Sequence, residues 1–223
     1  MTQDEAKLLV AKRAAELVED GMAVGLGTGT TATLFIRELG KRGLKIRCVA
    51  SSEASRELGL SLGMDVTTLD ELPELDVYID GADEVGPGLA LIKGGGGALL
   101  REKSVASAAR RFIVVVDSTK MVERLGKFPL PVEVIKMAFP LVEPKLAALG
   151  LHPKRRWAKS GDGPYLTDEG NYILDCACGA IEDPAAVAAE IRGIVGVVEH
   201  GLFLGMATLA LVAGEDGVTE FRA

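Results

Sequence analysis

Short apolar runs alternate with amphipathic stretches over the first half of this chain, and glycines or small polar residues separate them. The apolar runs, which predict strands, cover residues 22–26, 46–50, 66–69, 75–79, 89–92 and 112–116. The patterns with helical spacing cover residues 4–20, 31–42, a stretch that ends near Gly63, and 98–110. Strands that alternate with helices favour a mostly parallel sheet with helices on both faces. We therefore expect an α/β fold with a Rossmann-like sheet.

The alternation changes after residue 127. Strand-like segments then cover residues 129–137, 152–158, 171–177 and 196–203, with helical patterns at 140–149 and 184–193. This β-α-β-β-α-β order is typical of a ferredoxin-like unit. The apolar run at residues 207–212 can rejoin the first sheet. We expect a Rossmann-like catalytic domain of residues 1–127 and 205–223, and a smaller ferredoxin-like domain of residues 128–204.

Charge and hydropathy limit the partners of the chain. Its 223 residues carry a formal net charge of −7, which disfavours binding to nucleic acid or to an anionic membrane. No apolar stretch reaches the roughly 18 residues that span a bilayer. The acidic residues 1–5 lack the pattern of a signal peptide. We expect a cytoplasmic protein.

Cysteine and histidine are scarce. The chain has three cysteines and two histidines, and Cys176 and Cys178 are separated by one residue rather than two. A zinc site or a redox Cys-x-x-Cys site is therefore not expected.

Polar segments follow several of the predicted strands. They are residues 27–31, 80–83, 93–97 and 117–120. In open α/β sheets the ligand lies beyond the carboxyl ends of the strands, so we expect these four segments to converge on one crevice.

The segment Gly27-Thr28-Gly29-Thr30-Thr31 lies between a predicted strand and a predicted helix. Backbone N–H groups at a helix start favour an anion, and the threonines add hydroxyl donors, so a phosphate monoester is the favoured ligand. A dinucleotide site is the alternative, because Gly27-x-Gly29-x-x-Ala32 matches a degenerate fingerprint. A tight turn that only caps the helix is the structural alternative.

Two acidic residues, Asp80 and Asp83, follow the run at residues 75–79. They can act as acid–base groups if their surroundings separate their pKa values. A Mg²⁺ site, or an Asx turn without chemistry, would use the same residue types.

Lys93 precedes four consecutive glycines, and Glu102 follows about one helical turn after Ala98. A glycine run can form a nest of N–H groups for an oxyanion, to which Lys93 would add a full charge. Glu102 could then be a general base. The alternative is that Glu102 and Lys103 lie on a solvated helix face. Lys120, after the run at residues 112–116, could meet a phosphate as a point charge.

The chain resembles the type A ribose-5-phosphate isomerases over nearly its whole length. The resemblance rests on Gly-Thr-Gly-Thr-Thr at 27–31, Ser-Ser-Glu at 51–53, Asp-Gly-Ala-Asp-Glu at 80–84, Lys-Gly-Gly-Gly-Gly at 93–97 with Glu102, and Gly-Lys-Phe-Pro-Leu-Pro-Val-Glu at 126–133. Thr30, where serine is common in that family, keeps the hydroxyl. Lys136 departs from an expected proline in a region without assigned chemistry.

The resemblance implies that the chain interconverts D-ribose 5-phosphate and D-ribulose 5-phosphate in the pentose phosphate pathway, as a homodimer or homotetramer. It implies that Glu102 is the proton acceptor. It assigns substrate and phosphate binding to Thr28, Gly29, Thr30, Thr31 and Lys120. It assigns the sugar end to Asp80, Gly81, Ala82, Asp83, Lys93, Gly94, Gly95 and Gly96.

The chemistry of this isomerisation agrees with the residue types. One base can move the proton between C2 and C1, and Lys93 with the glycine N–H groups can stabilise the oxyanion. Asp80 is our choice for opening the furanose ring, with Asp83 orienting the sugar hydroxyls or Lys93. No cofactor or metal is needed. A sugar-phosphate sensor without catalysis and a nucleotide-dependent enzyme are the rival functions.

Overall fold

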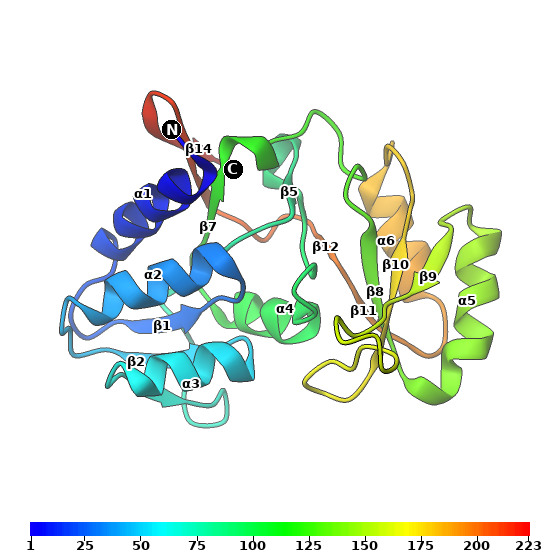
Figure 1. Cartoon of the computed structure of the whole chain (residues 1–223), viewed down its shortest axis with the longest axis horizontal. Helices are drawn as coiled ribbons and strands as arrows, with labels where there is room; N and C mark the ends of the chain where they lie inside the picture. The colour runs from blue at the N-terminus through cyan, green and yellow to red at the C-terminus, as the bar shows by residue number, and fades with distance from the viewer. The chain divides into compact units, whose positions relative to one another are not determined.

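The computed structural model describes residues 1–223 of the chain. Contacts divide these residues into two compact units (Figure 1). Unit 1 consists of Met1–Ala82, Arg101–Met121 and Gly205–Ala223, and unit 2 consists of Asp83–Leu100 and Val122–Leu204. Whether the parts fold independently, as the expected domain division at residue 127 implies, stays a prediction.

Unit 1 is built on a seven-stranded sheet with the order β14-β13-β7-β4-β1-β2-β3. Its strands are β1 Ala23–Leu26, β2 Arg47–Ala50, β3 Asp65–Thr67, β4 Val77–Asp80, β7 Phe112–Asp117, β13 Leu209–Gly214 and β14 Gly217–Arg222. All neighbours run parallel except β13 and β14. The expected parallel sheet is confirmed, and so is the return of the last apolar run, because β13 pairs with β7. The tail, which could also rejoin this sheet, forms its edge strand β14.

Four helices belong to this part of the chain: α1 Gln3–Glu16, α2 Thr30–Gly40, α3 Glu53–Ser61 and α4 Leu99–Ala108. A capping box fixes the start of α1, since the Thr2 hydroxyl accepts from the Glu5 N–H while the Glu5 carboxylate accepts from the Thr2 N–H. Apolar side chains of α1 and α2 pack on buried strand residues such as Ile79 and Val115. This burial, rather than helix propensity, holds the short helices in place.

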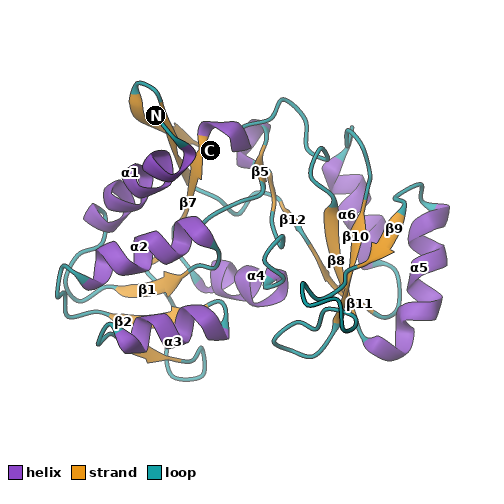
Figure 2. Cartoon of the chain, viewed as in Figure 1, coloured by secondary structure: helices purple, strands orange, loops and turns teal.

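Unit 2 contains a four-stranded antiparallel sheet with the order β11-β8-β10-β9. Its elements, in chain order, are β8 Leu130–Val134, α5 Phe139–Ala148, β9 Pro153–Arg155, β10 Tyr172–Cys176, α6 Pro184–Arg192 and β11 Val197–His200. This is the expected β-α-β-β-α-β order. Val132 and Leu174 of the sheet share a core with Val142 of α5 and Ile191 of α6. The two helices therefore cover one face of the sheet (Figure 2).

A second, three-stranded antiparallel sheet in unit 2 corrects two expectations. It contains β5 Glu84–Val85, β6 Leu91–Ile92 and β12 Leu202–Phe203. The expected single strand at 196–203 is wrong, because it breaks at Gly201 into β11 and β12. A Cβ at Gly201 would lie 2.3 Å from the carbonyl oxygen of Lys93. The close approach of the two backbones at this break therefore requires glycine.

The glycine run is also placed differently from the expectation. Residues 93–97 follow β6 and therefore leave the small antiparallel sheet, not the carboxyl edge of the parallel sheet. The alternation of strands with helices could not show which sheet the strand before the glycine run belongs to, since β6 is only two residues long.

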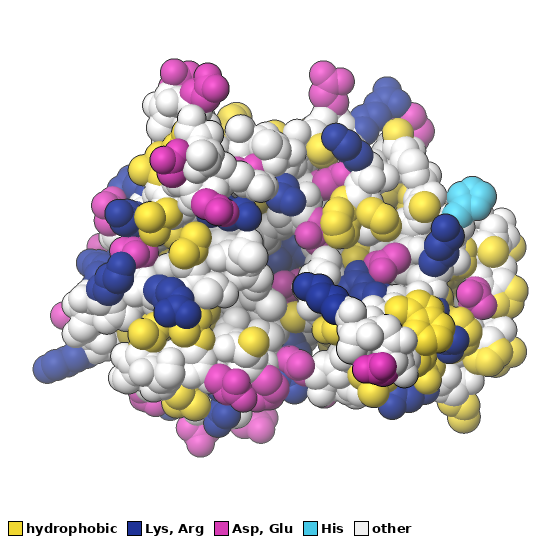
Figure 3. Space-filling model, viewed as in Figure 1, with side chains coloured by type: hydrophobic (Ala, Val, Ile, Leu, Met, Phe, Trp, Pro, Cys, Tyr) yellow, Lys and Arg dark blue, Asp and Glu magenta, His cyan; other side chains and the backbone are white.

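None of the helices combines the length and the hydropathy needed to cross a bilayer. On the face drawn in Figure 3, basic and acidic side chains are interspersed.

Candidate active site

Three of the four polar segments lie at neighbouring strand ends in unit 1. β1 leads into Gly27, β4 ends at Asp80, and β7 ends at Asp117. Because β4 pairs in parallel with both β1 and β7, these ends share one edge of the sheet. This is the edge where open parallel sheets bind ligands.

The turn after β1 leaves the start of α2 open to an anion. Gly29 is the residue before the helix, with φ of +103°, and no side chain caps the helix N–H groups. No acidic residue lies in the first turn of α2. Thr31 is buried, whereas Gly29 and Thr30 are exposed. Uncapped N–H groups at a positive dipole end suit a phosphate.

Asp80 holds this turn from the neighbouring strand. The side chain is fully buried, and its Oδ1 accepts hydrogen bonds from the N–H groups of Thr28 at 2.8 Å and Gly81 at 2.7 Å. A Cβ at Gly27 would lie 2.6 Å from the Cα of Asp80. The glycine is therefore needed for the close approach of β4 to the turn. The hydroxyl of Thr28 also lies 2.9 Å from that of Ser51.

Tyr78 is a residue of this network that the sequence analysis missed. Its hydroxyl donates to Oδ2 of Asp80, and its buried ring packs against Phe112 with 4.9 Å between centroids. Burial, followed by the charges of Asp80 and Glu102, raises the pKa of Tyr78 well above its usual value, so the phenol stays a donor at neutral pH. A tyrosine inside an apolar strand was the available signal, because a buried hydroxyl needs a partner.

Glu102 lies in the first turn of α4 and is only 4% exposed. The alternative of a solvated helix face is wrong, since Lys103 is buried as well. The preceding residue, Arg101, instead forms an ion pair with Glu53 at 2.7 Å. The charge of Glu102 acts on Tyr78, which places this carboxylate near the Asp80 network of unit 1.

Lys120 ends a short turn, Ser118–Lys120, that follows β7. The neighbouring Asp117 is buried, which opposes its ionisation. Hydrogen bonds from Thr119 and Gln3 and the charge of Lys120 outweigh this and lower the pKa of Asp117. Lys120 is partly exposed, so its ammonium adds positive charge at the same sheet edge as the α2 start.

In unit 2, Asp83 fixes the glycine run at residues 93–97. Its carboxylate accepts a hydrogen bond from the Gly95 N–H at 2.7 Å, and its own N–H donates to the carbonyl of Ile92. Gly94 and Gly97 adopt φ of +104° and +86°, and the Gly97 N–H closes a turn onto the Gly94 carbonyl at 2.9 Å. Only glycine adopts these angles readily, which accounts for the run.

Lys93 enters this turn from β6 with its side chain buried. The residue is 2% exposed, and its ammonium lies 5.5 Å from the ring centroid of Phe203. Cation–π attraction offsets part of the cost of burying the charge. The turn thus combines a positive charge with backbone N–H groups, as an oxyanion site requires.

The sequence-predicted site residues therefore fall into two groups. Unit 1 contains Thr28, Gly29, Thr30, Thr31, Asp80, Gly81, Ala82, Glu102 and Lys120. Unit 2 contains Asp83, Lys93, Gly94, Gly95 and Gly96. The chain itself links the groups, since Ala82 and Asp83 are consecutive.

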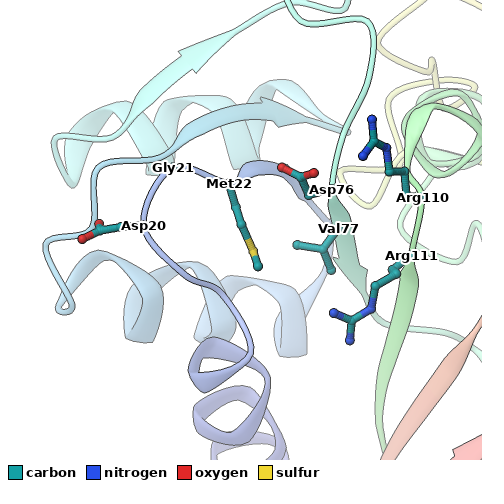
Figure 4. A pocket seen from close by; sticks show the side chains of 7 residues that line it. All are labelled: Asp20, Gly21, Met22, Asp76, Val77, Arg110 and Arg111. Carbon is teal, nitrogen blue, oxygen red and sulfur yellow. The ribbon is translucent and has the colours of Figure 1, made fainter.

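The pocket drawn in Figure 4 is a different feature of unit 1. Its volume is about 410 Å³, and it is lined by Asp20, Gly21, Met22, Asp76, Val77, Arg110 and Arg111. These residues precede or begin β1, β4 and β7, so the pocket lies at the amino edge of the sheet. One of its acidic side chains has a structural role, because the Asp76 carboxylate accepts a hydrogen bond from the Ala23 N–H at 2.8 Å.

No group of three or more His, Cys, Asp or Glu side chains is arranged to hold a metal ion. A reaction without metal or cofactor stays a prediction from the residue chemistry.

Comparison with known proteins shows the family of the chain. Residues 47–217 match the sequence profile of Ribose 5-phosphate isomerase A (phosphoriboisomerase A). The Ribose-5-phosphate isomerase A of Roseiflexus castenholzii is 54% identical over 218 residues, which cover 95% of this chain and 93% of that protein.

Two solved structures agree with the fold described above. The ribose 5-phosphate isomerase A of Methanocaldococcus jannaschii has a TM-score of 0.95 at 42% identity, with 100% of both chains covered. A D-ribose-5-phosphate isomerase in complex with phospho-erythronic acid has a TM-score of 0.97 at 38% identity, again with 100% of both chains covered. Since the profile spans most of the sequence and the relatives match it nearly end to end, this chain belongs to the ribose 5-phosphate isomerase A family.

Proposed function

We propose that Glu102 is the base with which this isomerase interconverts D-ribose 5-phosphate and D-ribulose 5-phosphate. The single observation that supports this role best is the burial of the carboxylate, 4% exposed, in the first turn of a helix that a glycine turn precedes. Burial removes competing water, and the positive end of the helix dipole lies beside the carboxylate. A base needs both properties to take a proton from carbon and return it.

In the aldose-to-ketose direction, Glu102 breaks the C2–H bond and keeps the proton. The electron pair forms the C1–C2 double bond of an enediolate, and O1 gains the negative charge and a proton. The proton that O1 gains is the one that the O2 hydroxyl loses as C2 becomes the ketone, and Glu102 returns its own proton to C1. The base ends as it began, so one carboxylate completes the cycle.

The developing oxyanion requires preorganised donors. Lys93 and the N–H groups of Gly94 and Gly96 fit this role, because the charge is buried and Asp83 fixes the turn by accepting the N–H of Gly95. Asp83 would orient the sugar hydroxyls or Lys93, and Asp80 would open the furanose ring.

The phosphate of the substrate fits the open start of α2. The uncapped N–H groups there, the hydroxyls of Thr28, Thr30 and Thr31, and the charge of Lys120 would bind it. Lys120→Ala should therefore raise KM about tenfold or more with less effect on kcat, since a phosphate contact is made equally in the ground and transition states. An unchanged KM would contradict the phosphate role of Lys120.

The decisive experiment follows ribose 5-phosphate in D₂O with EDTA by proton NMR. We expect ribulose 5-phosphate with deuterium at the transferred position, without added metal. Glu102→Gln should lower kcat by about 10²–10⁴-fold while Tm and inhibition by inorganic phosphate stay unchanged. Glu74→Gln, which alters an exposed carboxylate paired with Arg110, is the matched control.

Near-normal turnover of Glu102→Gln would show that Glu102 is not the base. Sugar phosphate binding by the wild-type chain without product or exchange would instead favour a sensor.

We also propose a homodimer or homotetramer in the cytoplasm, on the basis of the family resemblance. Light scattering coupled to gel filtration tests the first part, and a monomer at micromolar concentration would contradict it.

A further inference from the structure

Three successive carbonyls of the glycine turn point toward the same two side chains of unit 2. The carbonyls of Gly94 and Gly95 both accept from Nη1 of Arg156, at 2.9 and 3.3 Å. The carbonyl of Gly96 accepts from the hydroxyl of Tyr165 at 3.3 Å. A trans peptide directs its N–H opposite to its C=O. The N–H groups of Gly95 and Gly96 therefore point away from Arg156.

On that other side, the two N–H groups have different surroundings. The Gly95 N–H donates to Asp83 at 2.7 Å, so Arg156 and Asp83 hold the same peptide from opposite sides. The Gly96 N–H makes no hydrogen bond within the protein, and Gly96 is exposed. The exposed N–H of Gly96 is thus open to a ligand, and its direction depends on the contact of the Gly95 carbonyl with Arg156.

Arg156 is itself fixed by the sheet beneath the turn. Its Nε and Nη2 donate to the two oxygens of Asp175 on β10, at 2.8 and 2.5 Å. Its backbone N–H donates to the carbonyl of Ile173 on the same strand. The Arg156 side chain is only 14% exposed. A bidentate pair of this kind fixes the plane of the guanidinium and therefore the direction of Nη1.

We propose that Arg156 is a positioning residue for the isomerisation, which orients the peptides of Gly94 and Gly95 so that the Gly96 N–H meets the oxyanion of the enediolate. The inference rests on the proposed function of residues 94–96 at the sugar end. Arg156 acts through the turn and does not contact the substrate. Its charge is balanced by Asp175, so it acts through geometry, whereas the buried ammonium of Lys93 is the charged group of the turn. Lysine could not replace it, because one ammonium cannot bind Asp175 bidentately and both carbonyls together.

The test compares Arg156→Ala and Arg156→Lys with Arg124→Met. Arg124 forms an exposed ion pair with Glu182 in the same unit and has no contact with the turn. We expect kcat to fall by about 10- to 100-fold in both Arg156 variants, because a displaced donor loses its transition-state contact. The Ki of inorganic phosphate should stay within about twofold of wild type, as should kcat of Arg124→Met.

Rescue by guanidinium ion distinguishes a positioning role of Arg156 from a merely structural one. Added at low millimolar concentration, it should restore part of kcat in Arg156→Ala by occupying the vacated site, and should not change Arg124→Met. Wild-type kcat in Arg156→Ala, or a loss of kcat accompanied by an equal rise of the phosphate Ki, would overturn the inference. If Arg156→Ala does not fold, Asp175→Asn replaces it, and a wild-type kcat there overturns the inference equally.

Lys93→Met separates this inference from the proposed function. If Lys93→Met loses turnover while Arg156→Ala keeps wild-type turnover, the assignment of the turn to the sugar end stands. Only the role of Arg156 is then rejected. Normal turnover in Lys93→Met would reject the assignment of the turn itself.

Discussion

The two glycine turns of the molecule are held in place in different ways. The turn at residues 27–31 is held by a neighbouring strand of its own sheet, through the backbone approach of β4 and the carboxylate of Asp80. The turn at residues 93–97 closes on itself through the Gly97 N–H and the Gly94 carbonyl, and the side chains of Asp83, Arg156 and Tyr165 hold it from outside. The first support follows from sheet topology, whereas the second depends on particular side chains that a different sequence could lack.

Alanine substitution in each turn gives the largest expected difference. In Gly27→Ala the new Cβ would lie 2.6 Å from the Cα of Asp80, which no rotamer change relieves. We expect a loss of about 3 kcal/mol or more, which lowers Tm by roughly 6–12 °C for a chain of this length. Thermal unfolding followed by circular dichroism measures this.

Gly95→Ala is the matched substitution in the second turn. Its Cβ would lie 2.5 Å from Oδ1 of Asp83, and this side chain can rotate away. Gly95 has no positive φ, so alanine adds no backbone strain. We expect a small change of Tm and a clear loss of kcat, because Asp83 releases the turn. Equal losses of Tm in the two variants would contradict the distinction between backbone and side-chain support.

The two tyrosines that donate to these regions give a smaller difference. Tyr78→Phe keeps the packing against Phe112 but removes a donor to the fully buried Asp80. We expect a loss of about 1–3 kcal/mol in the free energy of unfolding, the usual cost of a buried polar group that loses a partner. Urea unfolding of the wild type and the variant measures it.

Tyr165→Phe is the control, because the partly exposed Tyr165 donates to the Gly96 carbonyl at 3.3 Å and water can replace it. Its stability should change by no more than about 0.5 kcal/mol. A larger loss for Tyr165→Phe than for Tyr78→Phe would show that the second turn is the more strongly held.

The same contrast explains what could be predicted from the sequence. The parallel sheet and the convergence of Gly27, Asp80 and Asp117 on one edge follow from the alternation of strands with helices, because the carboxyl ends of parallel strands share an edge. The order of the strands could not be predicted. For Glu102, the only sequence signal that favoured a buried position over a solvated helix face was the glycine run that precedes its helix. The support of the second turn could not be predicted, since Arg156 and Tyr165 lie 61 to 69 residues from the glycines that they contact and only the folded sheet brings them together.

A pH-dependent effect concerns Glu133, which lies on β8 in the sheet beneath the second turn and is 1% exposed. Thr167 and Asn171 both donate to its Oε1, at 2.9 Å each, while its Oε2 has no hydrogen-bond partner. Burial raises the pKa of Glu133, and these two hydrogen bonds offset only part of the rise. In this respect it contrasts with Asp80, both of whose oxygens accept hydrogen bonds.

The sign of the pH dependence follows from the raised pKa. The folded state holds the proton of Glu133 more tightly than the unfolded chain, so stability falls as pH rises from the unfolded-state pKa through the folded-state pKa. Glu133→Gln keeps the acceptor for Thr167 and Asn171 and removes the buried charge. The variant should therefore gain about 1 kcal/mol over wild type above that window and little below it. Urea unfolding of both proteins from pH 4 to pH 8 tests this, and a stability difference that does not change with pH would show that Glu133 is not the titrating group.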